Sequence, residues 1–344
     1  MNKVFLILPS LFLILLFLFC VGSLSNKKRI MKYINNPVLH KSNYYDNYFN
    51  VSNFNYSGDC GKVFKYKRHN SRDLLFYGIG YNAEQWKRNK PQLLRALRIT
   101  CSSIPFATKV MINFKEPPPQ DLQNEFNKYN FQIVQKPIKN ENPVNQRYIE
   151  YYYYLLKYKK NFDRVLIIDI RDVFVFGDIF STFSNQELVF TTQCYGIKNN
   201  ETRCNYFGQP GYPYNDEWLE KGFNKEIRNQ FCQNKYISLN AGVVLGGIEP
   251  MFEFLRIMRD SLLSRKEKLS FWGIEQATLN YLYYTNAFKK LNTTVDKCTQ
   301  RTCFSDWHNG MYNNKTKIMY SSLNGCSPVL RHKIKSSNHP IILT

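Results

Sequence analysis

Apolar and polar positions between residues 72 and 194 follow two spacings that predict strands separated by helices. Compact apolar runs, which are typical of buried strands, occupy residues 73–82, 108–114, 131–136, 165–170 and 187–194. Apolar residues recur every three to four positions at 91–104 and 144–160, which predicts two helices, and 121–130 predicts a shorter one. This alternation indicates an α/β domain with a largely parallel sheet.

The second half of the chain has a looser pattern. Residues 195–235 contain several Gly and Pro residues and are predicted to be rich in loops. Residues 236–247 predict a strand that is interrupted at Gly242, and 250–264 and 273–284 predict two further helices. The tail from Thr293 is predicted to be a loop that carries cysteines, followed by short apolar segments.

An acidic pair follows the strand predicted at 165–170. Asp169 and Asp172 stand at its carboxyl end, with Arg171 between them, and ligands of open α/β sheets bind beyond such ends. Side chains of an extended strand alternate between its faces, so both acids reach one point only if the chain bends after Asp169. Neighbouring carboxylates repel each other unless a cation lies between them, and their oxygens suit Mg²⁺ or Mn²⁺. In the alternative without a metal, Asp169 pairs with Arg171 and Asp172 caps a turn.

The N-terminal segment predicts entry into the secretory pathway. Residues 4–24 contain no charged side chain and can span a bilayer, which takes about 20 residues. We expect residues 1–25 to be a signal-anchor or a cleaved signal peptide. The length favours an anchor, whereas Ser23 and Ser25 offer a cleavage site and the basic residues 27–29 lie on the lumenal side, against the positive-inside tendency.

The two alternatives differ only in how the rest of the chain is held. An anchor makes it a single-pass type II protein of the ER or Golgi membrane with a lumenal globular part, and cleavage makes it secreted. Residues 26–71 are polar and rich in Asn, Tyr and Lys, and they are predicted to be a stem or linker.

Cysteines and sequons agree with a lumenal location. The chain has nine cysteines, and those after Cys20 form an even set that can pair in an oxidising compartment. Five Asn-X-Ser/Thr sequons are present, at Asn50, Asn55, Asn200, Asn292 and Asn314. The formal net charge of +21 favours anionic partners such as phosphorylated small molecules or membrane surfaces. In the lumen, nucleic acid is not expected as a partner.

Four segments, in order, resemble glycosyltransferases with the GT-A fold. Residues 164–180 (RVLIIDIRDVFVFGDIF) resemble the metal-site strand of that group, as a D-x-R-D variant of its D-x-D motif that resembles family 8-like enzymes. Residues 147–172 resemble the helix-then-strand lead-in, 239–247 (LNAGVVLGG) the L-N-(A/S)-G strand, and 275–280 (EQATLN) the D-Q-x-x-L-N helix.

The resemblance covers roughly residues 72–340 and carries expectations for fold and activity. It implies a three-layer α/β/α catalytic domain over residues 72–344. That domain would transfer a sugar from a nucleotide-sugar donor to a glycan or glycoprotein acceptor. It would use a divalent metal, Mn²⁺ or Mg²⁺.

The resemblance also implies which residues form the site. They are Asp169, Asp172 and His332 for the metal, Arg147, Arg171, Asn240, Ala241, Gly242 and Lys333 for the donor, and Glu275 and Gln276 for catalysis.

Departures from the group's pattern leave some of these roles open. The acids are one residue wider apart than in D-x-D, and we favour Asp172 as the principal metal contact because the sequence after it continues as in the group. Glu275 replaces the usual Asp. An inverting enzyme would use Glu275 as general base, and a retaining one would place Gln276 or Glu275 on the reacting face of the sugar. The metal-site histidine is His332 or, alternatively, His339.

Two other classes of protein are alternatives. One is a non-catalytic lumenal protein that binds carbohydrate or serves a structural role with the same fold. The other is an aspartate-dependent phosphohydrolase, which is disfavoured because its acids are spaced differently and no Asp-Asp pair follows downstream.

Overall fold

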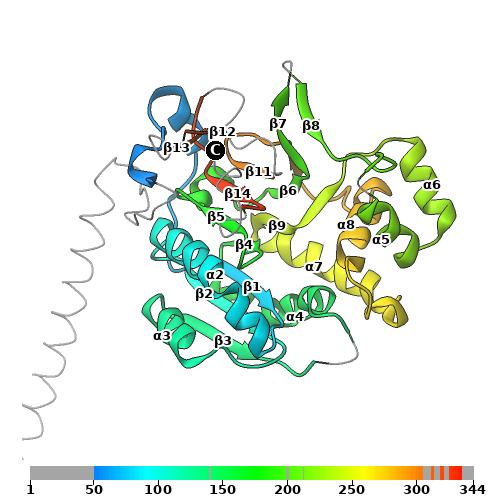
Figure 1. Ribbon diagram of the computed structural model, residues 1–344, viewed down its shortest axis with the longest axis horizontal. Helices are drawn as coiled ribbons and strands as arrows, with labels where there is room; N and C mark the ends of the chain where they lie inside the picture. Colours follow the sequence, from blue (N-terminus) through cyan, green and yellow to red (C-terminus); the bar gives the residue numbers. More distant parts are fainter. Residues whose placement is uncertain are drawn as a thin grey trace, which may run out of the picture. The chain divides into compact units, whose positions relative to one another are not determined.

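A seven-stranded sheet organises the protein, with the strand order β10-β6-β9-β4-β1-β2-β3 (Figure 1). Its strands are β1 (Asp73–Ile79), β2 (Thr108–Asn113), β3 (Phe131–Gln135), β4 (Arg164–Ile168), β6 (Leu188–Thr192), β9 (Leu239–Gly247) and β10 (Thr293–Asp296). Strand β9 is antiparallel to β4 and β6, and every other neighbouring pair is parallel. The predicted α/β fold with a mostly parallel sheet is therefore confirmed.

The computed structural model describes residues 50–138, 141–198, 201–211, 213–304, 311–313, 318–320 and 325–334. All of these residues belong to the unit that spans residues 40–344. The segment 1–25 lies outside the described residues, so its nature as anchor or signal stays a prediction. Within the described ranges, no helix is both long and apolar enough to span a membrane.

Helices lie against both faces of the sheet. They are α2 (Ala83–Ser103), α3 (Gln120–Lys128), α4 (Pro143–Tyr158), α5 (Tyr214–Gly222), α6 (Lys225–Gln233), α7 (Ile248–Leu263) and α8 (Ile274–Tyr284). Leu74 and Phe76 of β1 belong to a buried core that includes side chains of α4, α7 and α8. Tyr77 points to the opposite face and stacks on Phe131, which also contacts Phe126 of α3.

A smaller sheet joins the end of β4 to the C-terminal part of the chain. It has the order β11-β14-β5, with β5 (Val173–Val175), β11 (Thr302–Phe304) and β14 (Leu330–His332). Strand β14 is antiparallel to β5, and His332 pairs with Val173. The apolar run after Asp172 therefore forms a separate strand.

Two expectations for helices need correction. Helix α2 begins at Ala83 and not near residue 91, because Asn82 and Gln85 form a capping box and Pro91 lies inside the helix. Residues 195–235, predicted as loops, contain α5, α6 and a hairpin of β7 (Cys194–Lys198) and β8 (Glu201–Cys204). The two nine-residue helices are stabilised by tertiary packing, with Leu219 and Phe231 buried beside Ala277 of α8.

The described part of the predicted stem is also packed, which corrects its assignment as a loose linker for residues 50–71. Val51, Phe54 and Tyr56 are buried, and Tyr56 donates a hydrogen bond to the carbonyl of Pro328 (2.7 Å). A disulfide joins Cys60 to Cys326. These aromatic and disulfide contacts cannot be read from the polar composition of the segment.

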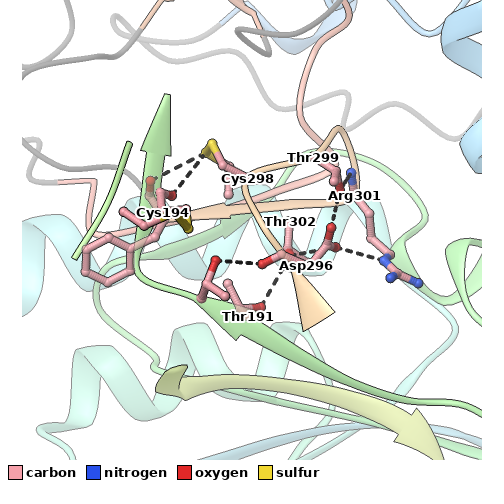
Figure 2. Close-up of a disulfide and its surroundings, with 11 residues drawn as sticks. Thr191, Cys194, Asp296, Cys298, Thr299, Arg301 and Thr302 are labelled. Carbon is pink, nitrogen blue, oxygen red and sulfur yellow. Dashed lines mark hydrogen bonds and ion pairs between the residues drawn. A yellow bond between two sulfur atoms is a disulfide. The ribbon is translucent and has the colours of Figure 1, made fainter. Parts of the chain in front are cut away.

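Six of the eight cysteines after Cys20 form disulfides. Besides Cys60–Cys326, the pairs are Cys194–Cys204 and Cys298–Cys303, whereas Cys101 and Cys232 are free thiols. Of the even set of eight that could pair, three pairs are therefore formed. Figure 2 shows that the two short-range disulfides lie side by side, next to Asp296, whose carboxylate pairs with Arg301 and accepts a hydrogen bond from Thr302.

Arg164 at the start of β4 ties three segments together. Its guanidinium donates two hydrogen bonds to Asp73 of β1 (2.8 and 2.7 Å) and others to the carbonyls of Lys67 and Arg68. Both charged side chains are at most 6% exposed. Because the pair is fully desolvated, removing one partner leaves a buried charge without compensation.

Replacing Arg164 by Met should therefore lower the free energy of unfolding by about 3–5 kcal/mol. The nearby Arg72–Asp163 pair, at 2.8 Å but 50% and 41% exposed, provides the matched control, and Arg72→Met should change stability little. Urea unfolding of the two variants compares them. Equal midpoints would show that the buried pair does not hold these segments together.

Candidate active site

Asp169 and Asp172 converge at the carboxyl end of β4. Strand β4 ends at Ile168, the chain turns through 169–172, and β5 begins at Val173. The N–H of Asp169 still donates to the carbonyl of Gly242 on β9 (2.9 Å), which positions its side chain. Because β14 runs beside β5, His332 lies next to Asp172.

A histidine joins the two carboxylates in one small cluster. The Nε2 atom of His332 is 3.4 Å from Asp169 Oδ2 and 3.6 Å from Asp172 Oδ1. One ligand atom from each of the three residues lies within 4.8 Å of the others. The chain thus bends as the metal hypothesis requires. The alternative pairing of Asp169 with Arg171 is wrong, because Arg171 contacts Asp172 (3.4 Å).

Two observations indicate that this cluster fits a cation. His332 is fully buried, its Nε2 faces both carboxylates without a hydrogen bond of ordinary geometry, and its Nδ1 has no hydrogen-bond partner among the described residues. A Cβ atom at Gly242 would lie 2.5 Å from both Asp169 Oδ2 and His332 Cε1. The glycine therefore keeps the space between the ligands open.

Three cations surround the acids and keep them ionised. Arg147 pairs with Asp169 (2.5 Å), and Lys333 pairs with Asp172 (3.0 Å) on the side where Arg171 also lies. Burial raises the pKa of Asp169, but Arg147 and His332 outweigh it and hold this pKa well below its usual range. Burial also raises the pKa of Asp172, but Lys333 and His332 outweigh this effect and lower the pKa. Both carboxylates are therefore negative and able to bind a cation at neutral pH.

Gly78 in β1 and Gly80 just after it allow α4 to place Arg147 in the site. A Cβ at Gly78 would lie 2.6 Å from Arg147 Cβ, and one at Gly80 would lie 2.4 Å from Pro143. Helix α4 starts at Pro143, and the Asn142 side chain caps it by accepting from the N–H of Val144. The first turns of α4 thus lie directly on the end of β1.

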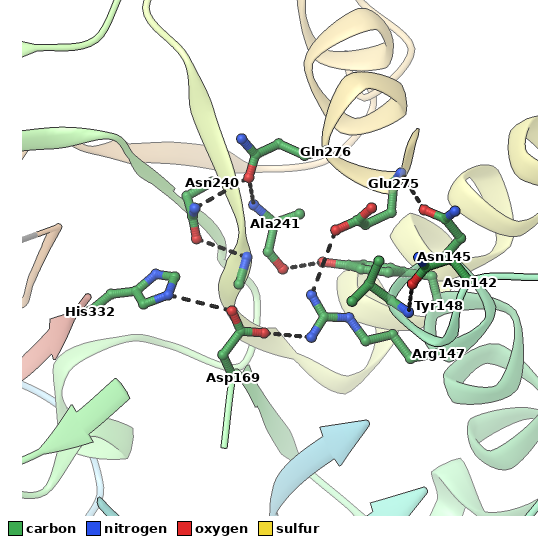
Figure 3. Close-up of polar contacts among 12 residues, drawn as sticks. Asn142, Asn145, Arg147, Tyr148, Asp169, Asn240, Ala241, Glu275, Gln276 and His332 are labelled. Atoms are coloured by element: carbon green, nitrogen blue, oxygen red, sulfur yellow. Dashed lines mark hydrogen bonds and ion pairs between the residues drawn. The ribbon is translucent and has the colours of Figure 1, made fainter. Parts of the chain in front are cut away.

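Glu275 lies on the far side of Arg147 from the metal cluster, as Figure 3 shows. Its Oε1 is 3.9 Å from Arg147 Nη2, and its Oε2 has no hydrogen-bond partner among the described residues. The backbone N–H of Glu275 donates to Asn145 Oδ1 (3.0 Å), which fixes the start of α8 against α4. Burial raises the pKa of Glu275, while Arg147 opposes this shift.

Gln276 uses its side-chain amide to hold β9. Its Oε1 accepts from Asn240 Nδ2 and from the N–H of Ala241, both at 3.2 Å. Its Nε2 donates to Asn215 Oδ1 (2.7 Å), and Asn215 donates to Gln193 (2.7 Å). The predicted residues Asn240, Ala241 and Gln276 are therefore brought together, with both ends of the Gln276 amide occupied by protein.

The structure brings together every predicted site residue except His339, which lies outside the described residues. Asn145 and Asn215 are neighbours of the site that sequence reasoning missed. Asn145 stands two positions before Arg147 on one helix, which is a usable signal. Asn215 lies in the segment predicted as loops, where no pattern marks it.

Comparisons with known proteins find distant likenesses among solved structures. No family model and no curated protein matches the chain. A solved structure described as the galactosyltransferase LgtC in complex with donor and acceptor sugar analogues is similar, with 13% identity and a TM-score of 0.40. The match covers 77% of this chain and 88% of that chain. A functional assignment therefore rests on the geometry of the site.

Gly242→Ala should weaken binding of Mn²⁺ at least about 10-fold, because the added methyl group would occupy the space between Asp169 and His332. Gly222→Ala is the control, since a Cβ there makes ordinary contacts with Ile274 (3.5 Å). Isothermal titration with Mn²⁺ measures the affinities, and circular dichroism checks folding. Undiminished Mn²⁺ affinity in a folded Gly242→Ala protein would show that the ion binds elsewhere.

Proposed function

We propose that the protein is a divalent-metal-dependent glycosyltransferase with a GT-A-like catalytic domain that uses a nucleotide-sugar donor. The observation that carries this proposal is the convergence of Asp169, Asp172 and His332 within 4.8 Å at the carboxyl end of β4, where open α/β sheets bind ligands. The four sequence segments that resemble this group of enzymes all contribute residues to the same place.

Asp169, Asp172 and His332 would hold the metal ion, Mn²⁺ or Mg²⁺. When bound, such an ion stabilises a diphosphate as a leaving group. Asp172 is 3% exposed and Asp169 is 24% exposed, so the donor would approach from the side of Asp169. The fully buried imidazole of His332 would supply the third ligand atom.

The three cations divide into two roles. Arg171 and Lys333 are 37% and 36% exposed, so their charged ends reach solvent and can also contact phosphate oxygens of the donor. Arg147 is 5% exposed and already pairs with Asp169. We therefore assign Arg147 to hold Asp169 and to neutralise the site, in addition to any contact with the donor. Asn240, Ala241 and Gly242 contribute the strand surface on which the sugar lies.

Glu275 is better suited than Gln276 to act on the acceptor hydroxyl. Gln276 has both ends of its amide engaged, whereas Glu275 keeps one carboxylate oxygen without a partner among the described residues. In the reaction, the acceptor oxygen bonds to the anomeric carbon, the bond to the diphosphate breaks with its electron pair, and the hydroxyl proton passes to Glu275.

The proposed compartment is the secretory pathway, with the N-terminal segment in the ER or Golgi membrane and the catalytic domain in the lumen. The three disulfides support an oxidising environment. The acceptor is accordingly proposed to be a glycan or glycoprotein, and nucleic acid is not a proposed partner.

Slow hydrolysis of nucleotide sugars tests the activity. A purified protein of residues 26–344 should release nucleoside diphosphate from at least one of a panel of nucleotide sugars, and only with Mn²⁺ or Mg²⁺. Asp172→Asn and His332→Ala should each lower this rate about 100-fold or more, because each removes a metal ligand. Asp163→Asn, which alters an acid that is 41% exposed and pairs with Arg72, is the control.

Other outcomes would identify the alternative classes. Release of phosphate from simple phosphomonoesters would indicate a phosphohydrolase. Binding of carbohydrate without any turnover, and without an effect of Asp172→Asn, would indicate a non-catalytic protein.

Counting free thiols tests the compartment. In the chain isolated from cells, maleimide should label only Cys101 and Cys232 among the eight cysteines after Cys20 when the denatured protein is not reduced. After reduction, all eight should react. Mass spectrometry counts the labels, and eight labels before reduction would contradict a lumenal location.

A further inference from the structure

Three aromatic side chains stand unusually exposed beside the candidate active site. Tyr214, Phe271 and Trp272, which we call the aromatic rim, are 54%, 45% and 59% exposed. Among the large apolar side chains of the described residues, that of Trp272 is the most exposed. Tyr and Trp are enriched at binding surfaces, and exposed apolar side chains that lie together often mark such a surface.

The backbone that presents Phe271 and Trp272 is held firmly. Asn145 donates its amide to the carbonyls of Leu269 (2.8 Å) and Phe271 (2.7 Å), and the N–H of Asn142 also donates to Leu269 (2.7 Å). The rings are thus displayed by a fixed loop, and little conformational entropy would be lost when a ligand binds.

Gly273 closes this loop against α5. It has a φ of +82°, and a Cβ there would lie 2.2 Å from the ring of Trp218. The centroids of the Trp218 and Tyr214 rings are in turn 6.3 Å apart. The half-buried Trp218 therefore connects Tyr214 to the loop of Phe271 and Trp272.

Hydrogen bonds connect the aromatic rim to both catalytic candidates. Asn145, which holds the carbonyl of Phe271, also accepts from the N–H of Glu275 (3.0 Å). Asn215, the neighbour of Tyr214 on α5, accepts from Gln276 (2.7 Å). The backbone that carries the rim is therefore next to Glu275, the residue proposed to take the proton of the acceptor. Figure 3 shows Glu275 on the other side of Arg147 from Asp169 and His332.

The size of the rim favours a small flat ligand over a protein partner. An aromatic side chain buries about 150–250 Å² when fully covered, so three partly exposed rings offer a few hundred Å². A stable protein interface takes about 800 Å² from each partner. The apolar C–H face of a pyranose ring matches one or two such aromatic rings.

We propose that the aromatic rim binds a pyranose ring of the acceptor, so that the acceptor is a carbohydrate chain whose reacting hydroxyl is directed toward Glu275. This inference rests on the proposed function and adds to it the place where the sugar of the acceptor binds. The pyranose ring that stacks on Trp272 would fix the orientation of the acceptor independently of the donor and the metal.

A glycan array tests this assignment. Residues 26–344 should bind a subset of arrayed oligosaccharides that contain pyranose rings. Trp272→Ala and Tyr214→Ala should each reduce that binding about 10-fold or more, in line with the loss of one aromatic contact in a small-ligand site. Tyr153→Ala, which removes a ring that is 45% exposed on α4, is the matched control and should bind as the parent does.

A separate measurement distinguishes failure of the rim from failure of the proposed function. Stabilisation by Mn²⁺ with a nucleoside diphosphate should be unchanged in Trp272→Ala and lost in Asp172→Asn. If the parent protein binds no arrayed glycan, or binds equally well without the two rings, the rim assignment is overturned while the metal site stands. Dimerisation that Trp272→Ala abolishes would also overturn it, because the rings would then serve a second copy of the chain. Loss of the Mn²⁺ effect in the parent protein would instead overturn the proposed function.

Discussion

The pairing of β14 with β5 is the contact on which the candidate site depends. It brings His332 beside Asp172 across 160 positions of sequence. Without it, the end of β4 would carry two carboxylates and no imidazole. Two hydrogen bonds extend this contact, since the N–H of Ile334 donates to the carbonyl of Asp172 and the side-chain amide of Gln92 on α2 donates to the carbonyl of Ile334. The C-terminal part of the chain is therefore held at the site from two sides.

Charge balance and free space are the second requirement of this site. The half-buried Asp169 lies close to the buried Asp172, which is tolerated because Arg147, Arg171 and Lys333 compensate their charges. Small residues then keep room for a ligand. Gly242 leaves the space between the ligating atoms open, and Gly78 lets α4 approach closely enough for Arg147 to reach Asp169. The same region thus combines a rigid protein frame with a small polar space, a combination that binding of an ion requires.

Much of the fold was predictable because its strong elements have clear local patterns. The strands β1, β2, β3, β4 and β6 and the helices α4, α7 and α8 all coincide with the predicted segments to within a few residues. The failures have physical causes. Helix α2 starts eight residues before Pro91, because the capping box at Asn82 stabilises its first turn. The helix then continues through Pro91, since its tertiary packing offsets the cost of a proline inside it. Helices α5 and α6 are too short to show a clear apolar period, and they depend on α8 for their burial.

For the site, the sequence by itself determined which residue types stand at the strand and helix ends: Asp169, Asp172, Arg147, Asn240, Gly242 and Glu275. These positions follow from local patterns, since a strand end or the first turn of a helix is visible in a short stretch of chain. Only the tertiary structure decided which of these groups meet. In that structure Arg147 pairs with Asp169, and His332 lies next to both acids. The two ends of the Gln276 amide form hydrogen bonds with β9 and α5. Spacing along a chain does not report such contacts, because they depend on strand register and helix packing between segments that are far apart in sequence.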